Sequence, residues 1–171
     1  MNCFVIMGVS GCGKTTVARA LADRTGGVFL DADDFHPPEN KQKMTAGIPL
    51  TDDDRRDWLT ALNRELRSRS HQNQPVFLAC SALRESHRRR IADAVPGLQF
   101  IHLRGSRECI ANRLAGRTGH FMSPSLLESQ FATLEEPSDA ITVDIDGPMD
   151  ALIEDLLLKL PPSVAKQRSA P

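Results

Sequence analysis

The sequence predicts an α/β domain in which a parallel sheet carries helices on both faces. Five short apolar runs alternate along the chain with segments whose apolar residues recur at helical spacing. The expected strands are residues 3–7, 28–30, 76–80, 98–103 and 141–145. No internal repeat or linker divides the chain, so we expect one domain over residues 1–160. Residues 161–171 are polar and contain proline, which predicts a disordered tail.

A glycine-rich loop lies between the first strand and the first helix. Its sequence fits the phosphate-binding pattern G-x-x-x-x-G-K-[ST], in the strand-to-helix context that this pattern requires. Loop N–H groups and the helix N-terminus attract anions, so Lys14 should reach the β- and γ-phosphates and Thr15 should bind Mg²⁺. The predicted nucleotide-binding residues are Gly8, Val9, Ser10, Gly11, Cys12, Gly13, Lys14, Thr15 and Thr16.

Composition narrows the possible partners. The 171 residues carry a net charge of -1, and without a basic excess we expect no nucleic-acid partner. No apolar run reaches membrane-spanning length, and the first strand leaves no room for a signal peptide, which predicts a cytoplasmic protein. The four scattered cysteines indicate reduced thiols, although Cys12 in the glycine-rich loop leaves a redox role open.

An acidic segment follows the second expected strand. Asp31, Asp33 and Asp34 precede His36 at a strand's carboxyl end, where ligands bind in open α/β sheets. The alternative is a loop whose acids cap the next helix. Further on, the acids at positions 52–54 are explained as the first turn of a helix, without a metal.

Two arginine-containing segments follow the third and fourth expected strands. A helix is expected to start at Ser81, and its run of arginines at 88–90 is typical of a solvated helix face. Residues 113–121 combine two arginines with two glycines, which favours a mobile cationic lid at about residues 115–124 over an ordinary basic loop.

These parts favour a small-molecule kinase among nucleotide-binding proteins. The GTPase patterns D-x-x-G and N-K-x-D do not occur in order, and no apolar strand ends in Asp-Glu as in an ATPase motor. In a kinase, one carboxylate holds Mg²⁺, another accepts or orients the acceptor hydroxyl, and arginines neutralise the transferring phosphoryl.

The chain also resembles the gluconokinases of the small P-loop type, relatives of shikimate kinase, over nearly its whole length. The shared segments beyond the glycine-rich loop are Asp-Asp-Asp-Arg at 52–55 with Trp58, Cys-Ser-Ala-Leu at 80–83, Gly-His-Phe at 119–121 and Leu-Glu-Glu-Pro at 134–137. Arg84 and His87 stand where the family usually has Lys and Tyr, Asp57 where it has Pro, and Asp34 is an extra acid.

The resemblance implies a P-loop NTPase fold like that of nucleoside monophosphate kinases, with strand order 2-3-1-4-5 and a lid. It implies phosphorylation of D-gluconate at the 6-hydroxyl by ATP with Mg²⁺, in a homodimer. By position, Asp31 becomes the Mg²⁺ carboxylate and Asp33 the catalytic base or an orienting group. Arg113, Arg117 and Pro148 fall on the nucleotide side, with Arg117 also catalytic. The implied substrate ligands are Asp33, His36, Arg55, Arg88, His120 and Gln130.

Two alternatives remain open from sequence alone. One is a kinase for another small hydroxy-acid, such as shikimate. The other is a nucleotide-gated binding module without transferase activity.

Overall fold

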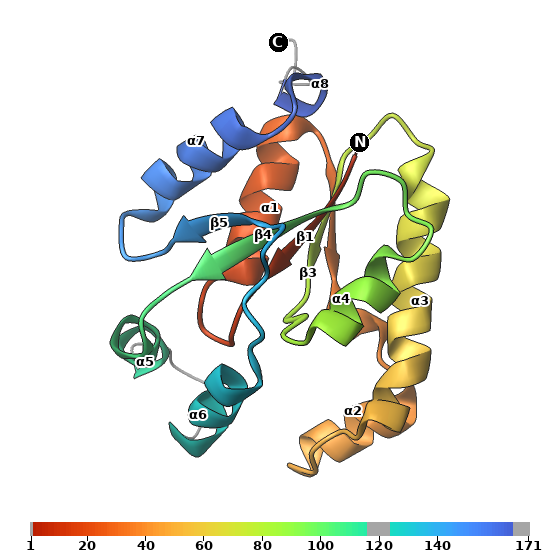
Figure 1. Ribbon diagram of the computed structural model, residues 1–171, viewed down its shortest axis with the longest axis vertical. Helices are drawn as coiled ribbons and strands as arrows, with labels where there is room; N and C mark the ends of the chain where they lie inside the picture. The colour runs from red at the N-terminus through yellow and green to blue at the C-terminus, as the bar shows by residue number, and fades with distance from the viewer. Residues whose placement is uncertain (1, 116–123, 166–171) are drawn as a thin grey trace.

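A five-stranded parallel sheet forms the centre of this computed structural model, which describes residues 2–115 and 124–165 (Figure 1). The strand order is β2-β3-β1-β4-β5, which confirms the order that the family resemblance implied. The strands are β1 (Cys3–Met7), β2 (Val28–Asp31), β3 (Val76–Ala79), β4 (Gln99–Arg104) and β5 (Ile141–Asp144).

Helices cover both faces of the sheet, as the alternation of apolar runs predicted. Helices α1 (Lys14–Thr25) and α7 (Met149–Lys159) pack on one face, where Phe4, Ile6 and Ile101 are fully buried. Helices α3 (Asp52–Ser70) and α4 (Glu85–Ala92) pack on the other, against Val5 and Leu78. Successive residues of β1 point to opposite faces, so a continuous apolar strand supplies both cores.

Shorter elements lie beyond the carboxyl ends of the strands. The 3₁₀ turn η1 (Ala32–Phe35) and α2 (Pro38–Thr45) follow β2, and α5 (Arg107–Ala115) and α6 (Pro124–Thr133) follow β4. In Figure 1, α2 lies at the lower right and α5 and α6 at the lower left. The chain therefore places α2 and α6 at the end of the sheet that carries the glycine-rich loop.

Helix α4 begins at Glu85, so the expected start at Ser81 is wrong. The φ angle of Ala82 is +43°, outside the helical region, and the Ser81 carbonyl accepts a hydrogen bond from the Gly8 N–H (3.3 Å). Residues 81–84 therefore form a connection against the glycine-rich loop.

The chain continues past α7 into a further short helix, α8 (Pro162–Ala165), within the segment expected to be disordered. Val164 is buried against the α1–α7 core, and this apolar contact orders the turn, which composition alone did not indicate. Residues 166–171 lie outside the described part of the chain. Within the described part, no helix combines the length and apolar character needed to cross a bilayer.

Candidate active site

The glycine-rich loop takes a conformation that favours glycine at Gly8, Gly11 and Gly13, whose φ angles are all positive. The φ angle of Gly8 is +141°, and a Cβ there would lie 2.8 Å from the Leu103 carbonyl oxygen. The φ angle of Gly11 is +87°, and a Cβ there would lie 2.8 Å from Leu114 Cγ. The loop is thus packed tightly between the end of β4 and helix α5.

Lys14 turns back over this loop. Its Nζ donates to the carbonyl oxygens of Gly8 (3.1 Å) and Val9 (3.0 Å). The ammonium group therefore stands at the centre of the loop, where the motif places the cation that meets the outer phosphates. Cys12 is buried, and burial raises the pKa of its thiol, which makes it a poor candidate for the redox role left open above.

Gln130 on α6 contacts the loop from the other side. Its Oε1 accepts from the Ser10 backbone N–H (2.6 Å), and its Nε2 donates to Ser10 Oγ (3.0 Å). Sequence reasoning named Gln130 as a substrate ligand, whereas the structure shows it bound to the glycine-rich loop.

Thr15 and Asp31 bring two oxygen groups together at the start of α1. Thr15 Oγ1 donates to Asp31 Oδ2 at 3.4 Å, and Asp31 Oδ1 accepts from the Asp33 backbone N–H at 3.1 Å. Asp31 therefore caps η1, as the capping alternative proposed, and also faces the hydroxyl of the motif. Hydroxyl and carboxylate oxygens are ligands that suit Mg²⁺.

Asp33 lies in the same cluster of charges. Burial, followed by repulsion from Asp31, raises the pKa of the Asp33 carboxyl, while His36 and Lys14 oppose the rise. A carboxyl group with a raised pKa, near the cation of a phosphate-binding loop, is suited to exchange a proton with a substrate hydroxyl.

His36 is held in place by Trp58 of α3. The two rings stack with centroids 4.4 Å apart, and Trp58 Nε1 donates to the Ala32 carbonyl oxygen (2.7 Å). His36 is 8% exposed, its Nδ1 makes no hydrogen bond with the described residues, and burial lowers the pKa of its ring. It is therefore a fixed, neutral imidazole beside Asp33, and its buried Nδ1 has no partner among the described residues. Sequence analysis named Trp58 only as part of the resemblance, without a role in the site.

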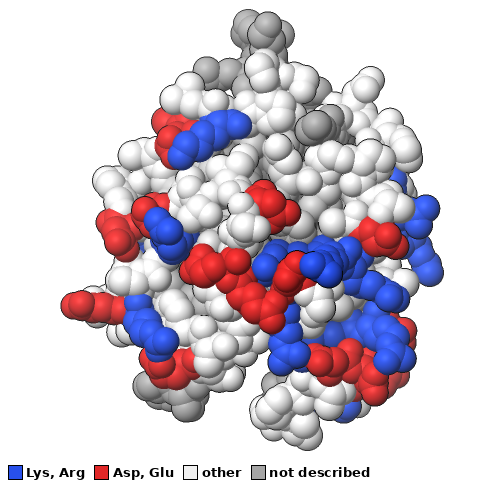
Figure 2. All heavy atoms as spheres, in the orientation of Figure 1, with Lys and Arg blue, Asp and Glu red and all other residues white. Residues whose placement is uncertain are grey.

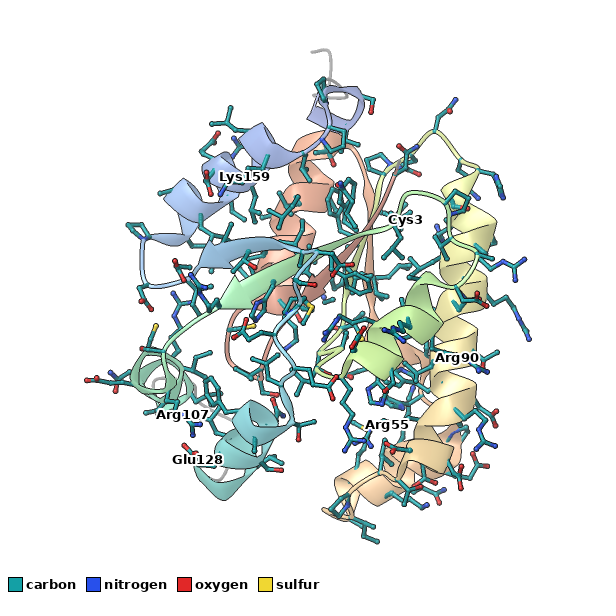
Figure 3. All side chains as sticks on the ribbon, viewed as in Figure 1. Cys3, Arg55, Arg90, Arg107, Glu128 and Lys159 are labelled. Atoms are coloured by element: carbon teal, nitrogen blue, oxygen red, sulfur yellow. The ribbon has the colours of Figure 1, made fainter. Side chains whose placement is uncertain are left out.

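Arg55 extends the site along α3. Its Nη1 donates to the Leu50 carbonyl oxygen (2.7 Å) and lies 3.7 Å from Asp52 Oδ1. Figure 3 shows Arg55 where α2, α3 and α4 meet. Thr51 and Asp54 form a capping box at this helix start, which confirms the capping interpretation of the acidic triplet.

Arg88 is buried, although it belongs to a run of three arginines that predicts a solvated helix face. It is 6% exposed and donates from Nη1 to the carbonyl oxygens of Ala82 (3.1 Å) and Leu83 (3.0 Å). The solvated-face interpretation is therefore wrong for Arg88, which fixes the connection between β3 and α4.

The nucleotide-side candidates lie near the ends of β5 and α5. Arg113 donates from Nη2 to the Ile145 carbonyl oxygen, and Pro148 is the N-cap of α7. Gly13 lies close to both segments, since a Cβ there would meet Met149 Cε at 3.4 Å and Arg113 Nη1 at 3.9 Å. Arg117, His120 and most of the expected lid lie outside the described residues.

Helices α5 and α6, which flank that undescribed stretch, are joined to each other. Arg107 forms an ion pair with Glu128, as Figure 3 shows, and its guanidinium carbon lies 4.9 Å from the centroid of the Phe131 ring. Among the described residues, no group of three or more histidine, cysteine and acidic side chains is placed to hold a metal ion by itself. A Mg²⁺ ion at this site would therefore need oxygen ligands in addition to the Thr15 and Asp31 side chains.

The fold and this site define a P-loop kinase: a phosphate-binding loop, a threonine–aspartate pair beside it and a second carboxylate at the same edge of the sheet. A family model described as an AAA domain matches residues 4–137. The thermoresistant gluconokinase of Escherichia coli is 42% identical over 154 residues, covering 88% of each chain. The gluconokinase of Gluconobacter oxydans is 45% identical over 157 residues, covering 90% of this chain and 88% of its own.

Solved structures agree with the sequence relatives. A gluconokinase crystal structure from Sinorhizobium meliloti superposes with a TM-score of 0.83 at 42% identity, covering 98% of this chain and 93% of that one. The chain belongs to the gluconokinase family.

Proposed function

We propose that this protein transfers the γ-phosphoryl group of ATP to the 6-hydroxyl of D-gluconate, giving 6-phospho-D-gluconate and ADP. Membership of the gluconokinase family supports gluconate over shikimate or another hydroxy-acid. The observation that supports transfer over binding alone is the placement of Asp31 and Asp33 at the phosphate loop, where Asp31 meets Thr15 at 3.4 Å.

Mg²⁺ would be held by Thr15 Oγ1 and Asp31 together with phosphate oxygens. This pair fits the ion because both groups supply oxygen and the two already approach each other. When bound, the ion neutralises charge on the outer phosphates. Lys14 then gives up its contacts with the Gly8 and Val9 carbonyls and binds those phosphates itself.

Asp33 would receive the proton of the attacking hydroxyl, or orient it. Its raised pKa increases the affinity of the carboxylate for that proton. In a loose transition state little base assistance is needed, so orientation remains the alternative role. His36 and Arg55 would bind the rest of the acceptor, while Arg88 fixes the neighbouring connection between β3 and α4.

Arg113 and Arg117 would act on the nucleotide side, His120 and the lid at about residues 115–124 would cover the acceptor, and Pro148 would border the base. The protein would act in the cytoplasm as a homodimer, which light scattering of the purified chain would test.

Coupled ADP release across a panel of sugar acids and shikimate tests the proposal. We expect Mg²⁺-dependent ADP release with D-gluconate, and the phosphorus resonance of the product should couple to the protons on carbon 6. ADP release with shikimate but not with gluconate would show that shikimate is the substrate. Nucleotide binding without ADP release for any of these acids would indicate a nucleotide-binding module without transferase activity.

A further inference from the structure

A cluster of two arginines and one histidine extends the site on the far side of Arg55. Arg55, Arg84 and His87 converge on the single carboxylate of Asp52. Arg84 Nη1 contacts both Asp52 oxygens (3.2 and 3.0 Å), Arg55 Nη1 lies 3.7 Å from Oδ1, and His87 Nε2 lies 3.9 Å from the same oxygen. Figure 2 shows acidic and basic side chains meeting over the α3–α4 side of the molecule.

This cluster is continuous with the phosphate-transfer site. Helix α3 makes the connection. Arg55 and Trp58 lie one turn apart on this helix, and Trp58 stacks on His36 with ring centroids 4.4 Å apart. Trp58 Nε1 also donates to the carbonyl oxygen of Ala32, the residue directly before Asp33 (2.7 Å). The helix that carries Arg55 is therefore anchored to the segment that carries Asp33.

The backbone explains why Arg84 reaches this place. Arg84 is the N-cap residue of α4, directly after the connection that Arg88 fixes through the carbonyls of Ala82 and Leu83. The same connection bonds to the glycine-rich loop through the Ser81 carbonyl and the Gly8 N–H. Arg84 is thus positioned by the part of the chain that contacts the phosphate-binding loop.

Asp52 is an exposed partner for the two arginines. Its side chain is 67% exposed, and it lies on the first turn of α3, where the capping box uses Thr51 and Asp54 instead. The α3 cap would therefore survive if Asp52 released the two arginines. Two guanidinium groups and an imidazole around one exposed carboxylate form a site that another carboxylate can enter by exchange.

We propose that Arg84, together with Arg55, binds the carboxylate of the acceptor, and that Asp52 occupies this position until the substrate displaces it. This inference rests on the proposed function and adds the residues that bind the carboxylate end of the acceptor. An extended hydroxy-acid would place its terminal hydroxyl at Asp33 and its carboxylate between Arg55 and Arg84. Arg84 is then a specificity-determining residue, which selects acids over neutral polyols.

Steady-state kinetics of Arg84→Gln with D-gluconate and with the uncharged D-gluconamide test this assignment. We expect the gluconate KM to rise about 10- to 100-fold, the range for a lost charge-assisted hydrogen bond, with kcat and the ATP KM within twofold of wild type. The wild-type preference for acid over amide in kcat/KM should fall at least tenfold. Arg56→Gln is the matched control, because Arg56 forms a similar ion pair with Asp53 on an exposed part of α3.

Asp52→Asn gives the complementary result. Removing the competing carboxylate should lower the gluconate KM two- to fivefold without changing the preference that Arg84 provides. An unchanged acid-to-amide ratio in Arg84→Gln would overturn the assignment of Arg84, and a raised KM in Asp52→Asn would overturn the exchange. Failure of the proposed function would instead be seen in the wild type, as absence of gluconate turnover.

Discussion

Gln130 of α6 holds Ser10 of the glycine-rich loop through two hydrogen bonds, one to the backbone N–H (2.6 Å) and one to Oγ (3.0 Å). The contact connects the nucleotide-binding loop with the helix that follows the undescribed residues 116–123. Changes at α6 can therefore reach the phosphate-binding loop through a single side chain.

Replacing Gln130 by alanine should weaken nucleotide binding. The loop would lose two neutral hydrogen bonds, worth together about 1–2 kcal/mol, so the ATP KM should rise about 5- to 30-fold. Ser129→Ala, on the exposed side of α6, is the control and should behave as wild type. An unchanged ATP KM in Gln130→Ala would show that the contact does not order the loop for ATP.

Replacing Arg88 by alanine should destabilise the fold. The carbonyls of Ala82 and Leu83 would lose a buried donor, which predicts a loss of about 2–3 kcal/mol in the free energy of unfolding. Arg89→Ala removes an exposed arginine paired with Glu85, and should change the free energy by less than about 0.5 kcal/mol. Urea denaturation measures both, and equal effects would contradict the buried role of Arg88.

Asp33→Asn should stabilise the protein at neutral pH. The folded-state pKa of Asp33 is raised above its unfolded value, so ionisation of this group opposes folding once the pH exceeds that value. The uncharged amide removes this cost, so the variant should melt at a higher temperature than the wild type at neutral pH.

The pH dependence of that gain identifies its cause. The gain should be complete at neutral pH and should decrease as the pH falls through the folded-state pKa. It should disappear below the unfolded-state pKa, where the Asp33 carboxyl is protonated in both the folded and the unfolded protein. Thermal melts of the wild type and the variant from pH 7 to pH 3 would show this. A gain that did not vary with pH would point to packing rather than charge.

The sequence predicted the layers and the phosphate-binding loop because both depend on local patterns. Apolar runs of strand length and helical spacing predicted β1, α1 and the two buried faces, and the loop motif placed Lys14 and Thr15. The strand order, in contrast, came from the family resemblance and not from spacing.

The details that sequence missed depend on contacts between distant residues. Gln130 and Ser10 are separated by 120 positions, and nothing local to either residue indicates their pairing. Arg88 belongs to a run of three arginines, and it is buried only because the connection before α4 turns its carbonyls inward at Ala82. Arg84 and His87 meet Asp52 because α3 and α4 start side by side.

The most direct test of the account is the turnover number of Asp33→Asn with saturating ATP, Mg²⁺ and D-gluconate, measured beside Asp34→Asn. The account predicts that Asp33→Asn loses about 10²–10⁴-fold in kcat, while it still binds ATP and melts no lower than wild type. Asp34→Asn, which removes the neighbouring carboxylate on the same 3₁₀ turn, should keep near-normal turnover. Near-normal turnover of Asp33→Asn would contradict the account, because the acid beside the phosphate-binding loop would then take no part in phosphoryl transfer.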